Sequence, residues 1–374
     1  MNATAIHQAY AEARERYAEL GVDAEQAISE LDHLAISLDA GMADRPPTDQ
    51  LSSYDDALRR DFMQARRQLP GQVRLTLHAA ISSPSAEAEP LPAADDETRY
   101  DVWMQWSREE QVPLDLHVAT GPGLLTLSSS DMSVRKPWVA RLLHYQDVAD
   151  AIGENQKKPC ILSFEIADQL GQPALNLVIH RQMLTKSLDQ LLSERRCWMR
   201  SCLMVPSSSA PDSTFVASHE QLVSYAMQHP VMLGLRADTG PSALSTMADT
   251  VASLPASVAS LSLILPNPCD RPVASHAQLN DEGVNLFRQL LCTGRHYRTH
   301  LTMSCRPCAD DRVSAIVTGI RDAQQSMLRA LLEPIQRMQD LELSGDERSK
   351  ALLLDNARSL PWPAVYDEFC NRKI

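Results

Sequence analysis

Short apolar runs recur along the chain, and segments of helical periodicity separate them. Nearly continuous apolar runs are typical of parallel strands that are covered on their outer face. The intervening segments repeat apolar residues every three or four positions, as amphipathic helices do. Strands are predicted at 34–39, 73–78, 113–117, 160–165, 200–205, 231–236, 258–265 and 299–304, and helices at 55–69, 98–111, 133–155, 182–195, 219–228, 243–254 and 281–291.

Eight strands in alternation with helices predict an α/β fold, a (β/α)8 TIM barrel. A doubly wound open sheet is the alternative, but that fold normally carries a glycine-rich first turn for its nucleotide. The turn after the first predicted strand, 39–44, has a single glycine. The segment 121–126 holds two glycines around a proline and is predicted to be a turn, and 43–53 and 82–96 are predicted to be exposed loops.

Further helices are predicted on both sides of the barrel. Asp23 precedes the second of them, and Gln26 three residues later completes a capping-box signature. These helices are predicted at 6–20 and 23–32, then at 310–343, 346–354 and 363–371. The chain is therefore divided into N-terminal helices (1–33) that pack on the barrel, the barrel itself (34–309) and a C-terminal helical extension (310–374).

Charge and composition exclude several classes of partner. The chain carries 35 Lys+Arg against 48 Asp+Glu, a net charge of −13, and has no basic block, so nucleic acid and anionic membranes are not expected partners. No apolar run reaches the roughly 18 residues that cross a bilayer. The first residues lack the basic and apolar regions of a signal peptide, and the eight cysteines suit free thiols, so a cytoplasmic location is expected.

Barrel enzymes place their sites at the carboxyl ends of the strands. Those ends offer Asp39, His78, His117, Glu165 and Arg236 as a candidate ligand pocket. The two carboxylates can serve as an acid/base pair or can cap the loops that follow them. Each histidine can be a ligand, or a structural residue whose ring nitrogen meets a backbone carbonyl. A guanidinium at position 236 repels a metal cation.

Other catalytic signatures are weak. Cys305 and Cys308 form a C-x-x-C pair after the last strand, which is too few ligands for structural zinc and lacks the usual setting of a redox pair. The chain contains neither a Gly-x-Ser-x-Gly elbow nor a His-Glu-x-x-His helix.

Several segments, read in order, resemble bacterial L-rhamnose isomerase over nearly the whole chain. They are 9–23 (AYAEARERYAELGVD), 29–38 (SELDHLAISL), 69–79 (LPGQVRLTLHA), 327–334 (MLRALLEP) and 359–370 (SLPWPAVYDEFC). The resemblance implies a tetrameric aldose–ketose isomerase that uses manganese with zinc or cobalt. In that family a glutamate, a histidine and several aspartates on the later strands bind the metals, which polarise the sugar oxygens.

Transferred position by position, those metal ligands are replaced in this chain. The corresponding residues are Leu203, Arg236, Ile264, Pro272, Ala274 and Ser304. A shift of register can recover Asp238 or Asp270 individually but not the whole set. No metal cofactor is therefore expected.

Two hypotheses follow from this replacement. The first is a catalytically degenerate L-rhamnose isomerase-like protein, a pseudoenzyme that acts by binding a sugar or a protein partner, as a possible homo-oligomer. The alternative is an active sugar isomerase that interconverts L-rhamnose and L-rhamnulose with relocated ligands, or a metal-free sugar enzyme that uses the candidate pocket residues.

Overall fold

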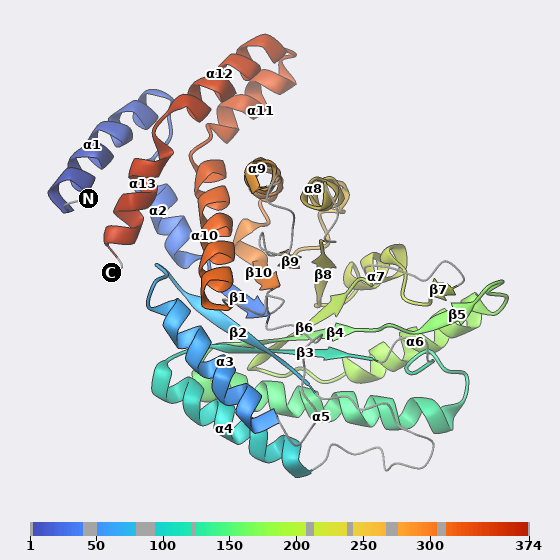
Figure 1. Cartoon of the computed structure of the whole chain (residues 1–374). Coiled ribbons are helices and arrows are strands. Elements are labelled where there is room, and N and C mark those ends of the chain that lie inside the picture. The colour runs from blue at the N-terminus through green and yellow to red at the C-terminus, as the bar shows by residue number, and fades with distance from the viewer. Residues whose placement is uncertain are drawn as a thin grey trace.

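The computed structural model of the chain describes residues 3–39, 51–79, 94–120, 125–206, 213–237, 242–266, 276–304 and 312–372. All eight predicted strands are present and close into a parallel barrel in the order β1-β10-β9-β8-β6-β4-β3-β2, which confirms the predicted fold (Figure 1). The barrel strands are β1 (Ile36–Asp39), β2 (Val73–His78), β3 (Leu114–Ala119), β4 (Cys160–Glu165), β6 (Met199–Met204), β8 (Met232–Arg236), β9 (Leu261–Leu265) and β10 (Thr299–Ser304).

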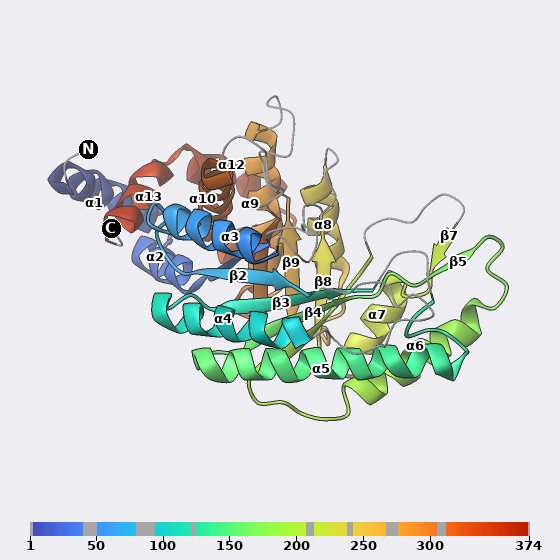
Figure 2. The ribbon, with the colours of Figure 1, turned by 60° about the horizontal axis from the view of Figure 1, so that its bottom comes forward.

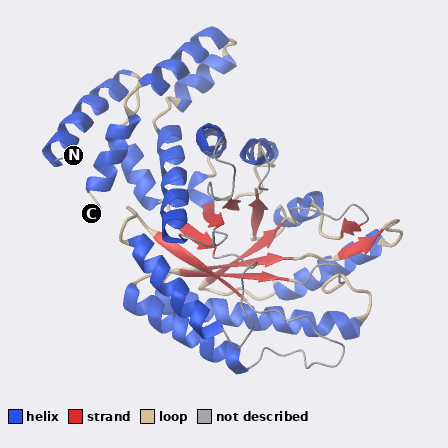
Figure 3. Cartoon of the chain, viewed as in Figure 1, coloured by secondary structure: helices blue, strands red, loops and turns tan. Residues whose placement is uncertain are grey.

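A layer of helices surrounds the strands, as the helix-period segments predict (Figures 2 and 3). These helices are α3 (Leu51–Arg66), α4 (Ala94–Glu110), α5 (Met132–Gln156), α6 (Leu177–Leu191), α7 (His219–Ala226), α8 (Ala243–Ser253), α9 (His276–Cys292) and α10 (Arg312–Leu331). Helices α3 and α4 each begin four residues before their predicted starts, 55 and 98. The first turn of α4 (94–97, ADDE) is largely polar, so periodicity does not reveal it.

Alternate residues of the strands face two different environments. Outward side chains such as Leu75, Leu116 and Leu263 join the large core between strands and helices. Inward side chains on β4, β6, β8 and β9 form a separate apolar cluster, whereas the inward positions of β1 to β3 are polar. The inner apolar cluster consists of Ile161, Cys202, Met204, Met232 and Ile264.

The terminal helices lie together beside the barrel (Figure 1). They are α1 (Ala3–Glu19), α2 (Ala24–His33), α11 (Ile335–Leu343), α12 (Glu347–Ser359) and α13 (Trp362–Asn371). Arg372 joins both ends of the chain, because its guanidinium lies 2.8 Å from Glu25 and 3.0 Å from Glu368. Asp23 caps α2 by accepting from the amides of Glu25 and Gln26, while the Gln26 side chain bonds to Glu30 instead of completing the capping box.

The tract predicted as one helix over 310–343 is two helices. Pro334 separates α10 from α11, since proline lacks the amide hydrogen that would continue the helix. Helix α10 packs against α9 and α3 and completes the helical layer, so the extension proper consists of α11 to α13. In addition, β5 (Gln169–Gly171) pairs antiparallel with β7 (Ser213–Phe215), a ribbon that the sequence pattern does not predict.

Parts of several other predicted segments lie outside the described residues: the loops 43–53 and 82–96, the turn 121–126 and the pair Cys305–Cys308. Within the described ranges, no helix combines the length and apolarity that a membrane crossing requires.

A buried ion pair fills the barrel interior near the amino ends of the strands. Arg74 donates twice to Asp115, with distances of 2.8 Å from Nε to Oδ2 and 2.5 Å from Nη2 to Oδ1. The same carboxylate accepts the Ile161 amide at 2.9 Å and lies 3.3 Å from His300 Nε2. Burial by itself raises the pKa of Asp115, but Arg74 and His300 hold it well below its usual range.

We predict that Asp115→Asn destabilises the fold by about 3 kcal/mol, measured by urea unfolding. Asparagine keeps the shape of the side chain and can still accept a hydrogen bond from the Ile161 amide. The loss of unfolding free energy therefore reports mainly on leaving the Arg74 charge unpaired. The matched control is the double variant Arg74→Met/Asp115→Asn, which should be less destabilised than Asp115→Asn because no lone charge remains. Equal or greater loss in the double variant would contradict this account.

Candidate functional site

The five residues proposed from the strand ends form one continuous polar chain at the carboxyl end of the barrel. Asp39, His78, His117 and Glu165 come from four adjacent strands, β1 to β4. Arg236 approaches from β8 and closes the chain at Glu165. The two imidazoles of His78 and His117 lie between Asp39 and Glu165. We call this set the mouth chain.

Its innermost link joins Asp39 and His78. The Nε2–H of His78 donates to Asp39 Oδ1, and both side chains are buried. Burial favours the neutral carboxyl, yet the neighbouring His78 outweighs this and lowers the pKa of Asp39. Among the described residues, the buried Nδ1 atom of His78 has no hydrogen-bond partner, so no described backbone carbonyl holds the ring as expected of a structural histidine.

The central link is a contact between the two imidazoles. The ring centroids of His78 and His117 lie 4.8 Å apart, because these residues are paired in the register of β2 and β3. His117 Nε2 lies 3.3 Å from Glu165 Oε2 and donates to that carboxylate. Burial lowers the pKa of His117 despite the nearby Glu165, so its ring is neutral at pH 7.

The outer link is an ion pair that water can reach. Arg236 Nη2 lies 3.0 Å from Glu165 Oε2. The Glu165 and Arg236 side chains are 24% and 27% exposed, in contrast to 2% for His117. Burial opposes ionisation of Glu165, but His117 and Arg236 together hold its pKa at about 2. A ligand that enters the mouth can therefore meet a fixed carboxylate and a fixed guanidinium.

Residues that the sequence pattern does not single out also contact the mouth chain. The carbonyl of His78 accepts from Arg99 Nη1 at 3.1 Å, and Arg99 is itself held by Asp55 at 2.8 Å. Asp55 also accepts from Trp103 Nε1 at 3.0 Å. Asp55 and Arg99 lie in the second turns of α3 and α4, two helices far apart in the sequence, and no sequence signal marks their contact.

A second supporting carboxylate, Asp168, lies three residues beyond Glu165. It is fully buried and accepts the amides of Thr126 and Ser128 at 2.8 and 2.9 Å. Asp168 thereby ties the segment after β3 to the segment after β4. Its position shortly after a strand end is the only sequence signal that could have singled it out.

The opposite half of the mouth has a different chemistry. Leu203, matched by resemblance to a metal-binding glutamate, belongs to the outer core, and the inward residue at the end of β6 is Met204. Met204 lies over Gly234, where an added Cβ would be 2.1 Å from the Met204 sulfur. Ile264 faces inward in the same cluster.

The inward strand ends on this half do not fit the family's metals. They present a thioether, a guanidinium, a sec-butyl group and a hydroxyl from Met204, Arg236, Ile264 and Ser304, and none of these is the carboxylate or imidazole that manganese or zinc prefers. Among the described residues, no three His, Cys, Asp or Glu side chains come together as a metal site. Pro272, Ala274, Asp238 and Asp270 lie outside the described ranges.

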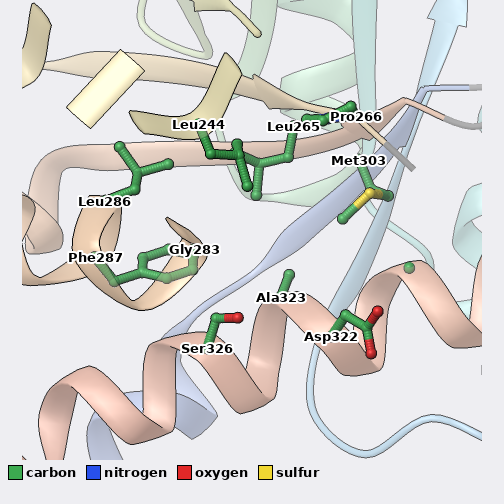
Figure 4. Close-up of a pocket in the computed structure, with 11 residues that line it drawn as sticks. Leu244, Leu265, Pro266, Gly283, Leu286, Phe287, Met303, Asp322, Ala323 and Ser326 are labelled. Carbon is green, nitrogen blue, oxygen red and sulfur yellow. The ribbon is translucent and has the colours of Figure 1, made fainter. Parts of the chain in front are cut away.

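One cavity can be set aside as a sugar site. It lies outside the strands, between α8, α9 and α10, and is lined by Leu244, Phe287 and Met303 among others (Figure 4). Its volume is about 30 Å³, which is close to that of one water molecule. The mouth chain is therefore the better candidate for a functional site.

A family model and several relatives match most or nearly all of the chain. The family model for L-rhamnose isomerase (RhaA) matches residues 46–374, which is most of the chain. The chain belongs to the L-rhamnose isomerase family. The L-rhamnose isomerase of Cronobacter sakazakii is 29% identical over 400 residues, covering 99% of this chain and 94% of that protein. That of Bacteroides thetaiotaomicron is 28% identical over 389 residues, covering 98% and 92%.

Solved structures similar to this member of the L-rhamnose isomerase family share its fold. A proposed sugar phosphate isomerase/epimerase from Anabaena variabilis superposes with a TM-score of 0.52 at 11% identity, covering 81% of this chain and 99% of that one. A broad-specificity endoglucanase from Ruminococcus flavefaciens superposes with a TM-score of 0.50 at 8% identity, covering 82% and 98%. At these identities the likeness concerns the barrel alone.

We predict that the free energy of unfolding falls as the pH is lowered from 7 to 3. Below the ordinary pKa of histidine, position 117 takes up a proton in the unfolded chain more readily than in the native state. Below about pH 4.5, position 165 does the same. The native state is thus favoured at neutral pH, and this advantage is lost on acidification. Glu165 accounts for about 2 kcal/mol of the loss.

Urea unfolding across this pH range measures the effect. His117→Asn should flatten the slope between pH 7 and 5, and Glu165→Gln should flatten it between pH 5 and 3. Asp147→Asn, at a carboxylate whose side chain is 64% exposed, serves as the control. A slope that neither mouth variant changes would contradict the assignment.

Proposed function

We propose that this chain is a sugar-binding member of the L-rhamnose isomerase family that does not carry out metal-dependent isomerisation. The observation that carries the proposal is the Glu165–Arg236 pair, with its Nη2–Oε2 distance of 3.0 Å. By resemblance, position 236 corresponds to a metal-binding aspartate. A permanent cation of the protein itself therefore stands where the family places a carboxylate for its metal.

The electrostatics of the mouth support this proposal. Arg236 lowers the pKa of both Asp39 and Glu165, so its charge acts on both carboxylates of the mouth chain. A divalent cation near Arg236 would be repelled by it and would have to compete with it for Glu165. The apolar surface of Met204 and Ile264 offers that cation no replacement ligand. Without a bound cation, isomerisation loses the several kcal/mol of transition-state stabilisation that a Lewis acid contributes.

The same groups suit the binding of hydroxyls. The Glu165 carboxylate can accept a hydrogen bond from a sugar hydroxyl, and the Arg236 guanidinium can donate one to a sugar oxygen. Both hydrogen bonds would be charge-assisted. Met204 and Ile264 offer an apolar wall for the C–H face of a sugar ring. Because buried His117 donates to Glu165, the carboxylate is already oriented in the absence of a ligand.

A second candidate is a metal-free sugar enzyme. The observation that favours it is that each carboxylate has its own imidazole partner, Asp39 with His78 and Glu165 with His117, which gives two candidate acid/base pairs. In that case Glu165→Gln would abolish turnover. If no sugar is converted by the unmodified protein, this candidate fails.

We predict that the purified protein, supplied with Mn²⁺, Co²⁺ or Zn²⁺, forms no L-rhamnulose from L-rhamnose above the protein-free control. A ketose assay measures turnover, and elemental analysis after desalting measures bound metal, which should be far below one ion per chain. Metal-dependent turnover at about 1 s⁻¹ or faster, an ordinary enzymatic rate, would overturn the proposal.

We also predict that L-rhamnose or a related deoxyhexose binds equally well with and without EDTA, measured by isothermal titration calorimetry. Arg236→Met should weaken this binding about tenfold, the loss of one charge-assisted hydrogen bond. Arg348→Met, on the exposed surface of α12, is the matched control and should leave it unchanged. Sugar binding that requires a divalent metal, or that survives Arg236→Met intact, would argue against the mouth chain as the binding site.

A further inference from the structure

The end of the barrel opposite the mouth chain contains a cavity of about 300 Å³. Helix α2, the amino ends of β2, β4, β6, β8 and β10, and the short 3-10 helix η4 (His296–Arg298) contribute its walls. This end of a barrel normally serves stability rather than ligand binding. The volume nevertheless reaches the size of small-molecule sites, which begin at about 300 Å³.

The charge of the cavity wall is opposite to that of the protein as a whole. The chain has a net charge of −13, yet the wall carries three arginines and three histidines against a single carboxylate. The basic side chains are Arg74, Arg200, Arg298, His33, His296 and His300, and the carboxylate is Glu30.

Two of these cations are available to a ligand. Arg74 is neutralised by Asp115. In the described part of the chain, neither Arg200 nor Arg298 makes a salt bridge, and both are exposed to solvent. Glu30, the one acid, is already occupied, because it accepts from Tyr297 Oη at 3.0 Å and from Gln26 Nε2 at 2.8 Å.

The strand register places Arg200 on the inner face of β6, at the solvent-exposed amino end of the strand. Inward and outward residues alternate along β6, and Cys202 and Met204 both belong to the inner cluster, so Arg200 shares their face. Arg298 ends η4 directly before β10 and lines the same cavity. The two guanidiniums line one space, and no described carboxylate pairs with either of them, an arrangement that a bound dianion would stabilise.

The rest of the wall limits the kind of anion. Ile161, Met232 and Met327 supply an apolar surface beside the cations. His33 uses Nδ1 to bond the Ser29 carbonyl at 2.6 Å, which leaves Nε2 as a further polar group at the edge. We infer that this cavity binds the phosphoryl group of a small phosphate monoester between Arg200 and Arg298, with its organic part on the apolar surface.

Calorimetric titration of the full chain at constant ionic strength tests the inference, with inorganic phosphate, glycerol 3-phosphate and glycerol as probes. One equivalent of glycerol 3-phosphate should bind, more tightly than inorganic phosphate, and glycerol should not bind. Arg200→Gln/Arg298→Gln should weaken phosphate ester binding at least tenfold, and each single variant should weaken it less. Arg348→Gln, a surface arginine on α12, should match the unmodified protein.

Absence of phosphate ester binding, or equal binding by the double variant, would overturn the inference. Tighter binding of inorganic phosphate than of glycerol 3-phosphate would overturn the assignment to a monoester. Equal melting temperatures of all variants without phosphate confirm that they are folded. Because the cavity and the mouth chain lie at opposite ends of the barrel, Arg236→Met is expected to leave phosphate ester binding unchanged, so the outcome is independent of sugar binding.

Discussion

The interior of a closed barrel must be filled by side chains, and in this chain many of those side chains are paired charges. Arg74, Asp115 and His300 occupy the amino end, and the mouth chain from Asp39 to Arg236 occupies the carboxyl end. Buried charges of this kind are tolerated only when each one is matched by an opposite charge or a hydrogen bond. The interior is therefore not interchangeable with a generic apolar core, and the register of β1 to β4 is determined by these partners as well as by the outer leucines.

The two halves of the interior have consequently diverged in chemistry. On the β1–β4 side, carboxylates and imidazoles persist and hold one another. On the opposite side, Met204 and Ile264 pack as a small apolar cluster, and Arg236 is the one inward charged group among the described strand ends there. A family scaffold with this division keeps the shape of the barrel while it changes what the carboxyl end can bind.

The sequence pattern predicts the strands well because each is short, apolar and buried on its outer face, as Val73–His78 and Cys160–Glu165 illustrate. It predicts the long C-terminal helical tract less well, since the interruption at Pro334 is a local backbone effect within a continuous helical composition. Strand-end position selects all five members of the mouth chain. It does not show their mutual contacts, which depend on barrel closure and on side-chain length, nor that Met204 rather than Leu203 faces inward.

The contact between Met204 and Gly234 links the identities of two neighbouring strands. A Cβ at position 234 would lie 2.1 Å from the Met204 sulfur and 2.9 Å from the Cys202 sulfur, so a larger residue there requires the flexible Met204 side chain to move. The conformation or identity of residue 204 is thereby coupled to the size of residue 234. A wall rebuilt with a larger side chain at position 234 would therefore change the inner apolar cluster on β6 as well.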